Sequence, residues 1–317
     1  HYKVPGPGTA VVGMEVTKDG IAYLVANNYK DIVGINLKTG EEVFRAKTAH
    51  GPDERAINLG LAISPDGSRI YSYEIPSRVH ADRYEALPTR ISVYAADGGL
   101  EATPIKQFTN VPRRIHILMT NPEGDKLYAL GWDLYTLNAE TGEIIDTYPL
   151  RNWRRENAGP PDMLNFWPMP EASGLFSSLL TYVRTDLEES DPEAFVFGAL
   201  TLDLKSGEAD VRTLKVEPRV YFTGTIAPDR RHLFAGYLVL SKFDLETGEE
   251  LKTVPLDHSY YQVNVSLDGK EVYTAGTMCD IGIFSTDDLK KLGEVVLPDC
   301  PDMGPSPFRM VDIDLGE

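Results

Sequence analysis

The sequence of 317 residues is poor in cysteine and tryptophan, and it has no apolar run near the ~20 residues that a membrane-spanning helix needs. Its two cysteines, Cys279 and Cys300, are too few for a disulfide-stapled scaffold but enough for one bridge. Basic residues are also in deficit, because 31 Lys and Arg stand against 48 Asp and Glu, a net charge of −17. Nucleic acid and anionic membranes both attract basic surfaces. We therefore expect no nucleic-acid partner and no membrane insertion.

Motifs for catalysis or cofactor binding are also missing. The sequence lacks the Cys-x-x-Cys-His of covalently bound c-type haem, the Gly-rich phosphate loop, His-Glu-x-x-His and Gly-x-Ser-x-Gly. The six histidines are not spaced as metal ligands. The acidic run Asp186–Asp191 does not have the spacing of a calcium loop, so we interpret it as a solvated loop. We expect no catalytic residue, metal or cofactor on this chain.

The sequence does contain a repeated pattern of short strands, and its clearest copy lies between Asp257 and Pro298. Four strands are predicted there, over Tyr260–Ser266, Glu271–Gly276, Ile281–Ser285 and Glu294–Leu297. Asp268-Gly269 supplies a tight turn between the first two, because glycine adopts a positive φ without steric cost. Four antiparallel strands in about 40 residues have the size of one propeller blade.

Five earlier segments repeat this unit at intervals of about 40 to 60 residues. Each has a turn after its first strand and a Thr-Gly-like turn after its third, such as Thr39-Gly40 and Thr141-Gly142. No long amphipathic helix interrupts the series, which disfavours an α/β fold. We predict an all-β fold, a seven-bladed β-propeller of four-stranded antiparallel blades forming a single domain over residues 1–317. Its last blade would be incomplete, with one clear strand at Phe308–Asp314.

The long insertions fall at 75–89, 151–162 and 185–194, in second-to-third loops or in connectors between units. In an up-and-down blade both kinds of segment emerge at the same end, so we place function at that loop-rich end. Cys279 and Cys300 are expected at this end too, where a disulfide and two free thiols are both open. A disulfide would indicate an oxidising compartment.

Two connectors combine aromatic side chains with arginine, asparagine or histidine, a composition enriched at interface hot spots. The candidate substrate-cavity or interface residues are Arg151, Asn152, Trp153, His258, Tyr260 and Tyr261. Such residues could instead pack between blades, and for Trp167 and Tyr261 we favour packing. For Trp153, His258 and Tyr260 both interpretations stay open.

Several of these segments resemble the β subunit of quinohemoprotein amine dehydrogenase, a seven-bladed propeller related in architecture to the heavy subunit of methylamine dehydrogenase. The resemblance extends from about Pro5 to the final predicted strand. The matching segments are Gly6–Ala10, Pro149–Trp153, Pro161-Asp162 with Phe166-Trp167-Pro168, Tyr221–Gly224, Leu256–Tyr261 and Val272–Gly276.

The resemblance implies a heterotrimeric periplasmic enzyme that converts primary amines to aldehyde and ammonia. In that family the small γ subunit carries a cysteine tryptophylquinone, and the α subunit carries two c-type haems that pass electrons onward. The β propeller carries neither cofactor; it docks the γ subunit and helps to wall the substrate cavity. The resemblance implies no catalytic residue on this chain.

Two other functions stay open. The chain could be a free-standing periplasmic propeller that binds protein or peptide without enzyme activity, or a propeller lactonase, which would need inward-facing histidines or carboxylates that we do not identify. The sequence also departs from the family, whose members begin with about 40 further residues that complete the last blade. We therefore expect either a trimmed chain or an open last blade with an unpaired strand edge at Phe308–Asp314.

Overall fold

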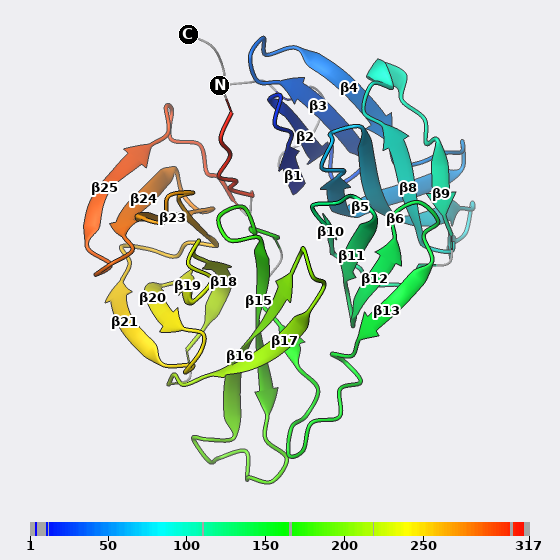
Figure 1. Ribbon diagram of the computed structural model, residues 1–317. Coiled ribbons are helices and arrows are strands. Elements are labelled where there is room, and N and C mark those ends of the chain that lie inside the picture. The colour runs from blue at the N-terminus through cyan, green and yellow to red at the C-terminus, as the bar shows by residue number, and fades with distance from the viewer. Residues whose placement is uncertain are drawn as a thin grey trace. The chain divides into compact units, whose positions relative to one another are not determined.

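The computed structural model gives every defined element as a β-strand, except for one short 3₁₀ turn, η1 (Gly99–Glu101) (Figure 1). Contacts within the chain divide it into two units, and each is described by itself. Unit 1 comprises residues 1–148 with 311–317, and unit 2 comprises residues 149–310. The residues that the structure describes are 4, 11, 13–109, 111–164, 167–217, 219–304 and 307–313.

Unit 1 contains three antiparallel sheets whose strands follow chain order. The first sheet consists of β1 (Gly13–Val16), β2 (Ile21–Ala26), β3 (Asp31–Asn36) and β4 (Glu42–Lys47). The second consists of β5 (Glu54–Ile63), β6 (Arg69–Val79), β8 (Arg90–Ala95) and β9 (Lys106–Phe108), and β7 (Tyr84–Ala86) pairs with the end of β6. The third consists of β10 (Ile117–Thr120), β11 (Lys126–Leu130), β12 (Leu134–Asn138) and β13 (Ile144–Tyr148).

Unit 2 contains three more sheets of the same order. The fourth sheet consists of β14 (Asp162–Met163), β15 (Leu175–Val183), β16 (Phe195–Asp203) and β17 (Ala209–Leu214). The fifth consists of β18 (Tyr221–Ile226), β19 (His232–Tyr237), β20 (Val239–Asp244) and β21 (Glu250–Pro255). The sixth consists of β22 (Gln262–Val265), β23 (Glu271–Ala275), β24 (Asp280–Ser285) and β25 (Lys291–Val296).

A local device repeated in both units ends the third strand of a sheet. At the end of β12, the Asn138 side chain accepts hydrogen bonds from the backbone N–H groups of Glu140 and Thr141, at 2.9 and 2.8 Å. The next residue, Gly142, adopts a φ of +72°, which a residue with a side chain rarely does. Asp244, Thr247 and Gly248 repeat the same arrangement at the end of β20. Short-range chemistry therefore sets where β12 and β20 stop.

Within each unit, neighbouring sheets pack face to face through alternate residues of their strands. In unit 2, Val263 and Val265 of β22 pack with Phe234 and Leu240 of the fifth sheet, and all four are buried. In unit 1, an equivalent cluster around Tyr23 and Phe44 joins the first sheet to the second. A fully buried side chain of this size contributes about 1.5–3 kcal/mol. These successive up-and-down sheets define an all-β propeller of four-stranded antiparallel blades.

Two predictions need correction. The described residues form six blades, not seven. The strand predicted at Phe308–Asp314 is wrong as far as the structure describes it, because residues 307–313 have no strand pairing. The physical reason is that the Phe308 carbonyl accepts from the Asn264 side chain, and the Arg309 side chain holds the segment through Glu171, in place of backbone pairing with a neighbouring strand. The single domain predicted over residues 1–317 stays a prediction.

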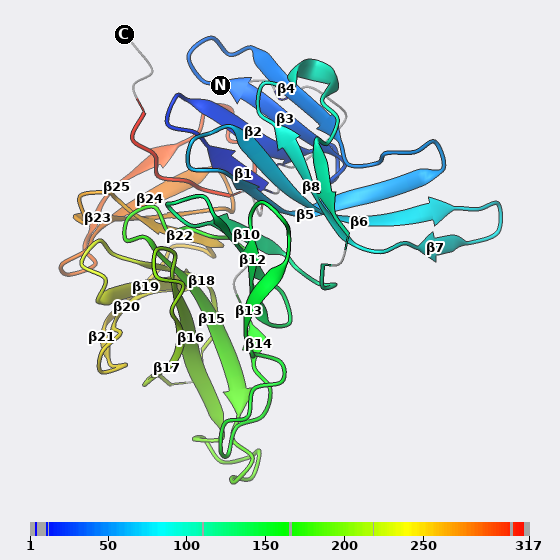
Figure 2. The same ribbon diagram turned by 45° about the vertical axis from the view of Figure 1, so that its right-hand side comes forward.

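The insertion at 75–89 does not form an irregular loop. It lengthens β6 to Val79 and adds β7, so that the second sheet continues as a narrow three-stranded arm beyond its neighbours (Figure 2). The insertion at 185–194 instead joins the long strands β15 and β16 by turns. Both insertions are second-to-third connections.

Candidate functional site

The connector that precedes the sixth sheet is held against the fifth sheet by backbone hydrogen bonds. The N–H of Leu256 donates to the carbonyl of Leu238 at 3.0 Å, and the N–H of Tyr260 donates to the carbonyl of Tyr237 at 2.8 Å. Both acceptors lie at the turn between β19 and β20. A connector bonded at both ends presents its side chains in a fixed orientation.

His258 and Tyr260 of this connector share one carboxylate, that of Asp280 at the start of β24. His258 Nε2 lies 2.8 Å from Asp280 Oδ1, and the Tyr260 hydroxyl donates to Asp280 Oδ2. The two rings stack with centroids 4.1 Å apart. Burial of Tyr260, together with its bond to Asp280, raises the pKa of the Tyr260 hydroxyl well above its ordinary value, so Tyr260 is a neutral donor.

Cys279, which directly precedes Asp280, forms a disulfide with Cys300. The two Cα atoms are 4.8 Å apart, and 21 positions of sequence separate them. The N–H of Leu297 also donates to the carbonyl of Cys279 at 2.7 Å. Of the two arrangements left open by the sequence, the structure therefore has the bridge. The disulfide and the shared carboxylate fix the same loop from two sides.

Tyr261 points away from this cluster and belongs to a group of three rings. Its ring centroid lies 4.8 Å from that of Phe222 and 5.8 Å from that of Tyr237, with the tyrosine rings within 11° of parallel. All three are half-buried, and Val220 and Leu238, from the same end of the fifth sheet, are 57 % and 55 % exposed. We call Val220, Phe222, Tyr237, Leu238 and Tyr261 the aromatic patch. Exposed apolar groups on a rigid base are typical of docking surfaces.

Trp153 lies in the connector before the fourth sheet and packs against that sheet. Trp153 is buried, its Nε1 donates to the carbonyl of Gly159 at 2.7 Å, and its ring packs edge-on against Tyr182 with centroids 5.1 Å apart. The Arg155 guanidinium carbon lies 4.7 Å from the Trp153 ring centroid. These contacts are those of a packing residue of the fourth sheet.

Arg151 and Asn152 are exposed beside Trp153. The six candidate residues therefore form two groups, one in the connector before the fourth sheet and one in the connector between the fifth and sixth sheets. Of the segments that carry the family resemblance, Gly6–Ala10 and Phe166 lie outside the described residues.

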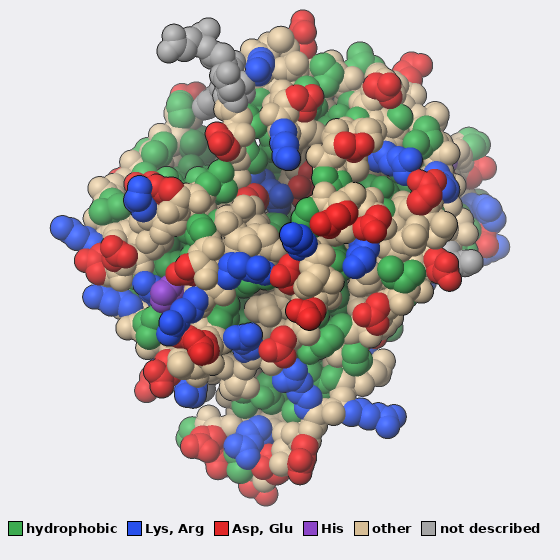
Figure 3. All heavy atoms as spheres, in the orientation of Figure 1, with side chains coloured by type: hydrophobic (Ala, Val, Ile, Leu, Met, Phe, Trp, Pro, Cys, Tyr) green, Lys and Arg blue, Asp and Glu red, His purple; other side chains and the backbone are tan. Residues whose placement is uncertain are grey.

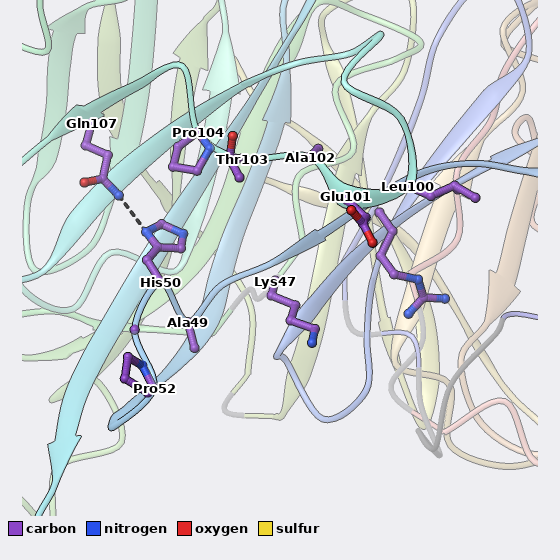
Figure 4. Close-up of a pocket in the computed structure, with 12 residues that line it drawn as sticks. Lys47, Ala49, His50, Pro52, Leu100, Glu101, Ala102, Thr103, Pro104 and Gln107 are labelled. Atoms are coloured by element: carbon purple, nitrogen blue, oxygen red, sulfur yellow. Dashed lines mark hydrogen bonds between the residues drawn. The ribbon is translucent and has the colours of Figure 1, made fainter.

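A groove in unit 1 was not predicted from the sequence. It has a volume of about 940 Å³ and lies between β4, the 49–52 loop and the 100–104 segment (Figure 4). His50 and Gln107 point toward one another on its wall, with Gln107 Nε2 at 2.7 Å from His50 Nδ1. His50 Nε2 lies 3.1 Å from the Tyr94 hydroxyl, so both ring nitrogens are engaged.

The Tyr94 hydroxyl that contacts His50 is in turn bonded to a buried carboxylate, that of Glu74. Glu74 is fully buried and accepts hydrogen bonds from Arg90 Nε at 2.7 Å, from the Ser92 hydroxyl at 2.9 Å and from the Tyr94 hydroxyl at 2.9 Å. Burial raises the pKa of Glu74, an effect that the charge of Arg90 opposes. Burial and the nearby Arg90 lower the pKa of His50, which is therefore a neutral part of the groove wall at pH 7. The available sequence signal was Glu74, a charged residue directly after the predicted strand at Arg69–Tyr73.

On the face shown in Figure 3, acidic and basic side chains are interspersed with apolar ones. Within the described part of the chain, no three potential metal-ligating side chains come together. The same part contains no helix long and apolar enough to cross a membrane.

Comparisons with known proteins give the chain no family. No family model matches it, and no curated protein sequence matches it. Among solved structures, it is similar to Kuenenia stuttgartiensis hydrazine synthase at 12 % identity, with a TM-score of 0.49, over 90 % of this chain and 97 % of that one. A likeness at this level carries no information about activity. The class is defined by the sheets themselves, as an all-β propeller.

Proposed function

We propose that this chain is the propeller subunit of a periplasmic quinohemoprotein amine dehydrogenase, an oxidoreductase acting on primary amines, and that it docks the quinone-bearing γ subunit. The observation that carries the proposal is the aromatic patch. It presents apolar side chains on one end of the fifth sheet and on the adjoining connector, which backbone hydrogen bonds and the Asp280 carboxylate hold in place. A surface ordered before binding loses little conformational entropy when a partner docks. The resemblance of Leu256–Tyr261 to the family supports the identity of that partner.

In this assembly the cysteine tryptophylquinone of the γ subunit supplies the two-electron oxidation of the amine, and the c-type haems of the α subunit accept the electrons. This chain contributes binding energy and walls the amine cavity, with His258 and Tyr261 as candidates for that wall, while Tyr260 is buried against Asp280. Excluding water from such a cavity strengthens the electrostatic interactions inside it. No cofactor is assigned to this chain.

A periplasmic location is part of the proposal. The bridge between Cys279 and Cys300 supports it, because structural disulfides persist in oxidising compartments and are rare in the cytosol.

Purification of the native protein from its own host tests the proposal. We expect the chain to co-purify with a polypeptide that has c-type haem absorbance and with a small quinone-bearing polypeptide. Redox-cycling stain on a denaturing gel detects the quinone. Purification of the chain alone would overturn the proposal.

The second candidate is a free-standing module that binds protein or peptide. The aromatic patch favours it too, because the patch could dock such a partner without the chain belonging to an enzyme. It predicts a single polypeptide in the native preparation, with no haem spectrum and no amine oxidation. The two candidates therefore give opposite results in one experiment.

A further inference from the structure

The C-terminal segment 307–310 is held in unit 2 by a buried ion pair. Arg309 Nε lies 2.6 Å from Glu171 Oε1, and the two side chains are only 10 % and 11 % exposed. Arg309 Nη1 also donates to the backbone carbonyl of Pro168. The guanidinium therefore sits against a carboxylate and a carbonyl, which are both acceptors. Such a pair of acceptors suits a guanidinium, which carries only donors.

Two further contacts hold the residue before the arginine. Asn264 Nδ2 donates to the carbonyl of Phe308 at 3.1 Å, and the Phe308 ring lies 6.1 Å from the ring of Tyr273. Asn264 is fully buried, and its own Oδ1 accepts from the N–H of Val265 at 2.9 Å, which fixes its orientation. Unit 2 therefore contacts the segment at three groups, namely the Arg309 side chain, the Phe308 carbonyl and the Phe308 ring.

These contacts lie on one face of the sixth sheet. Asn264 and Tyr273 face each other across β22 and β23, so they share a face. Val263 and Val265 alternate with Asn264 and pack against the fifth sheet on the opposite face. The segment therefore covers the face of the sixth sheet that the fifth sheet does not.

The ion pair couples Glu171 to the C-terminal segment 307–310. Burial raises the pKa of Glu171, and the charge of Arg309 opposes that effect. Removing the guanidinium would leave a buried carboxylate with no compensating charge, which is strongly unfavourable.

We propose that Glu171 and the carbonyl of Pro168 form a binding site for a guanidinium group, and that the chain's own Arg309 fills it. Residues 307–310 then act as a strap whose attachment to unit 2 depends on that one side chain. The chemical class of ligand is an alkylguanidinium, presented on an extended segment with an aromatic residue before it. This site is independent of the proposed docking function.

Chemical rescue of the full-length chain tests the site. We expect Arg309→Ala to lower the melting temperature by roughly 5 °C, because it leaves Glu171 buried and unpaired. Millimolar ethylguanidinium should then raise the melting temperature of this variant by binding in the vacated site. The wild-type protein, whose site is filled, should not respond.

Two control variants separate the site from general effects of the reagent. Arg231→Ala removes an arginine of the same unit whose side chain is 55 % exposed and paired with Asp244, and it should show no rescue. The double variant Arg309→Ala with Glu171→Gln should also show none, because the carboxylate is gone. Equal rescue of Arg231→Ala, or none in Arg309→Ala, would overturn the proposal.

Limited trypsin digestion of the wild-type protein provides a test without any variant. The bond after Arg309 should resist cleavage while exposed sites such as Lys290 are cut, because the protease needs the arginine side chain for recognition. Rapid cleavage after Arg309 in the folded protein would also contradict the strap.

Discussion

At the scale of single residues, Asp280 joins two of the residues selected from the sequence, His258 and Tyr260, although it was not itself selected. One oxygen accepts from the Tyr260 hydroxyl and the other lies 2.8 Å from His258 Nε2. Tyr260 is 1 % exposed, so its hydroxyl has no ready access to water if that acceptor is lost. A buried donor without a partner carries its full desolvation cost.

We therefore expect Asp280→Ala to lower the free energy of unfolding by about 1–3 kcal/mol. Urea denaturation followed by fluorescence measures it. Asp257→Ala is the matched control, because Asp257 is 73 % exposed and pairs with Lys291 on the surface. This control should change stability by less than about 0.5 kcal/mol. Equal effects of the two substitutions would remove the special role of Asp280.

Asp66, in the turn between β5 and β6, provides a pH-dependent prediction. Its hydrogen bonds from the Ser64 hydroxyl, at 2.5 Å, and from the N–H of Ser68, at 3.0 Å, lower the pKa of Asp66 from 3.8 to about 2. The charged form is favoured by folding, so its stabilising contribution is complete above about pH 4 and is lost as the pH falls through about 2.

Carboxyl-selective NMR titration should accordingly give Asp66 a midpoint near pH 2. Ser64→Ala should raise this midpoint toward the ordinary value of 3.8, since it removes the largest contribution. An unchanged midpoint in the variant would show that Ser64 does not hold the carboxylate.

At the scale of elements, two glycine turns of unit 2, one between β20 and β21 and one directly before β15, differ in how tightly their surroundings enclose them. Gly248 has a φ of +73°, and a Cβ there would lie 2.3 Å from the carbonyl oxygen of Thr213. Gly174 has a similar φ of +69°, but a Cβ there would meet nothing within 4 Å. Both glycines have a left-handed backbone conformation, and they differ in whether an added Cβ would clash with a neighbour.

Substitution by alanine should separate these two contributions. Gly174→Ala is expected to cost about 1 kcal/mol, from the left-handed backbone alone. Gly248→Ala is expected to cost roughly 2 kcal/mol or more, because the clash is with backbone and cannot be relieved by a rotamer change. Chemical denaturation of both variants measures the difference, and equal losses would contradict the clash.

The disulfide between Cys279 and Cys300 belongs to the same scale, because it ties the loop before β24 to the segment after β25. Replacing both cysteines by serine should cost about 3 kcal/mol, as expected for a closed loop of this length. Guanidinium denaturation of the variant and of the oxidised wild-type protein measures this difference. The reduced wild-type protein should match the variant, since both lack the bridge.

At the scale of the whole molecule, the proposed function depends on the aromatic patch. Leu238→Asp places a charge in the patch without removing any buried contact, because Leu238 is 55 % exposed. We expect at least about tenfold weaker binding of the γ subunit, with an unchanged melting temperature. Leu251→Asp, at a 48 % exposed position on β21, is the matched control and should bind normally. Calorimetric titration of the purified subunits measures both affinities.

The sequence by itself determined the strands and their turns. Asp268-Gly269 and Thr247-Gly248 act over a few residues, so their effect on the backbone is local and readable in order. The alternation of Val263 and Val265 with polar residues gave the sheet faces for the same reason. A prediction of repeated four-stranded blades therefore needed no tertiary information.

The tertiary structure alone decided which distant side chains meet. Asp280 has no sequence signal that links it to His258, and Arg309 lies far along the chain from Glu171. The sequence likewise left the cysteine pair open, and it did not show that Tyr261 packs against Phe222 and Tyr237. Pairings of this kind depend on how loops and connectors are placed by the packed sheets, a long-range result that no local pattern encodes.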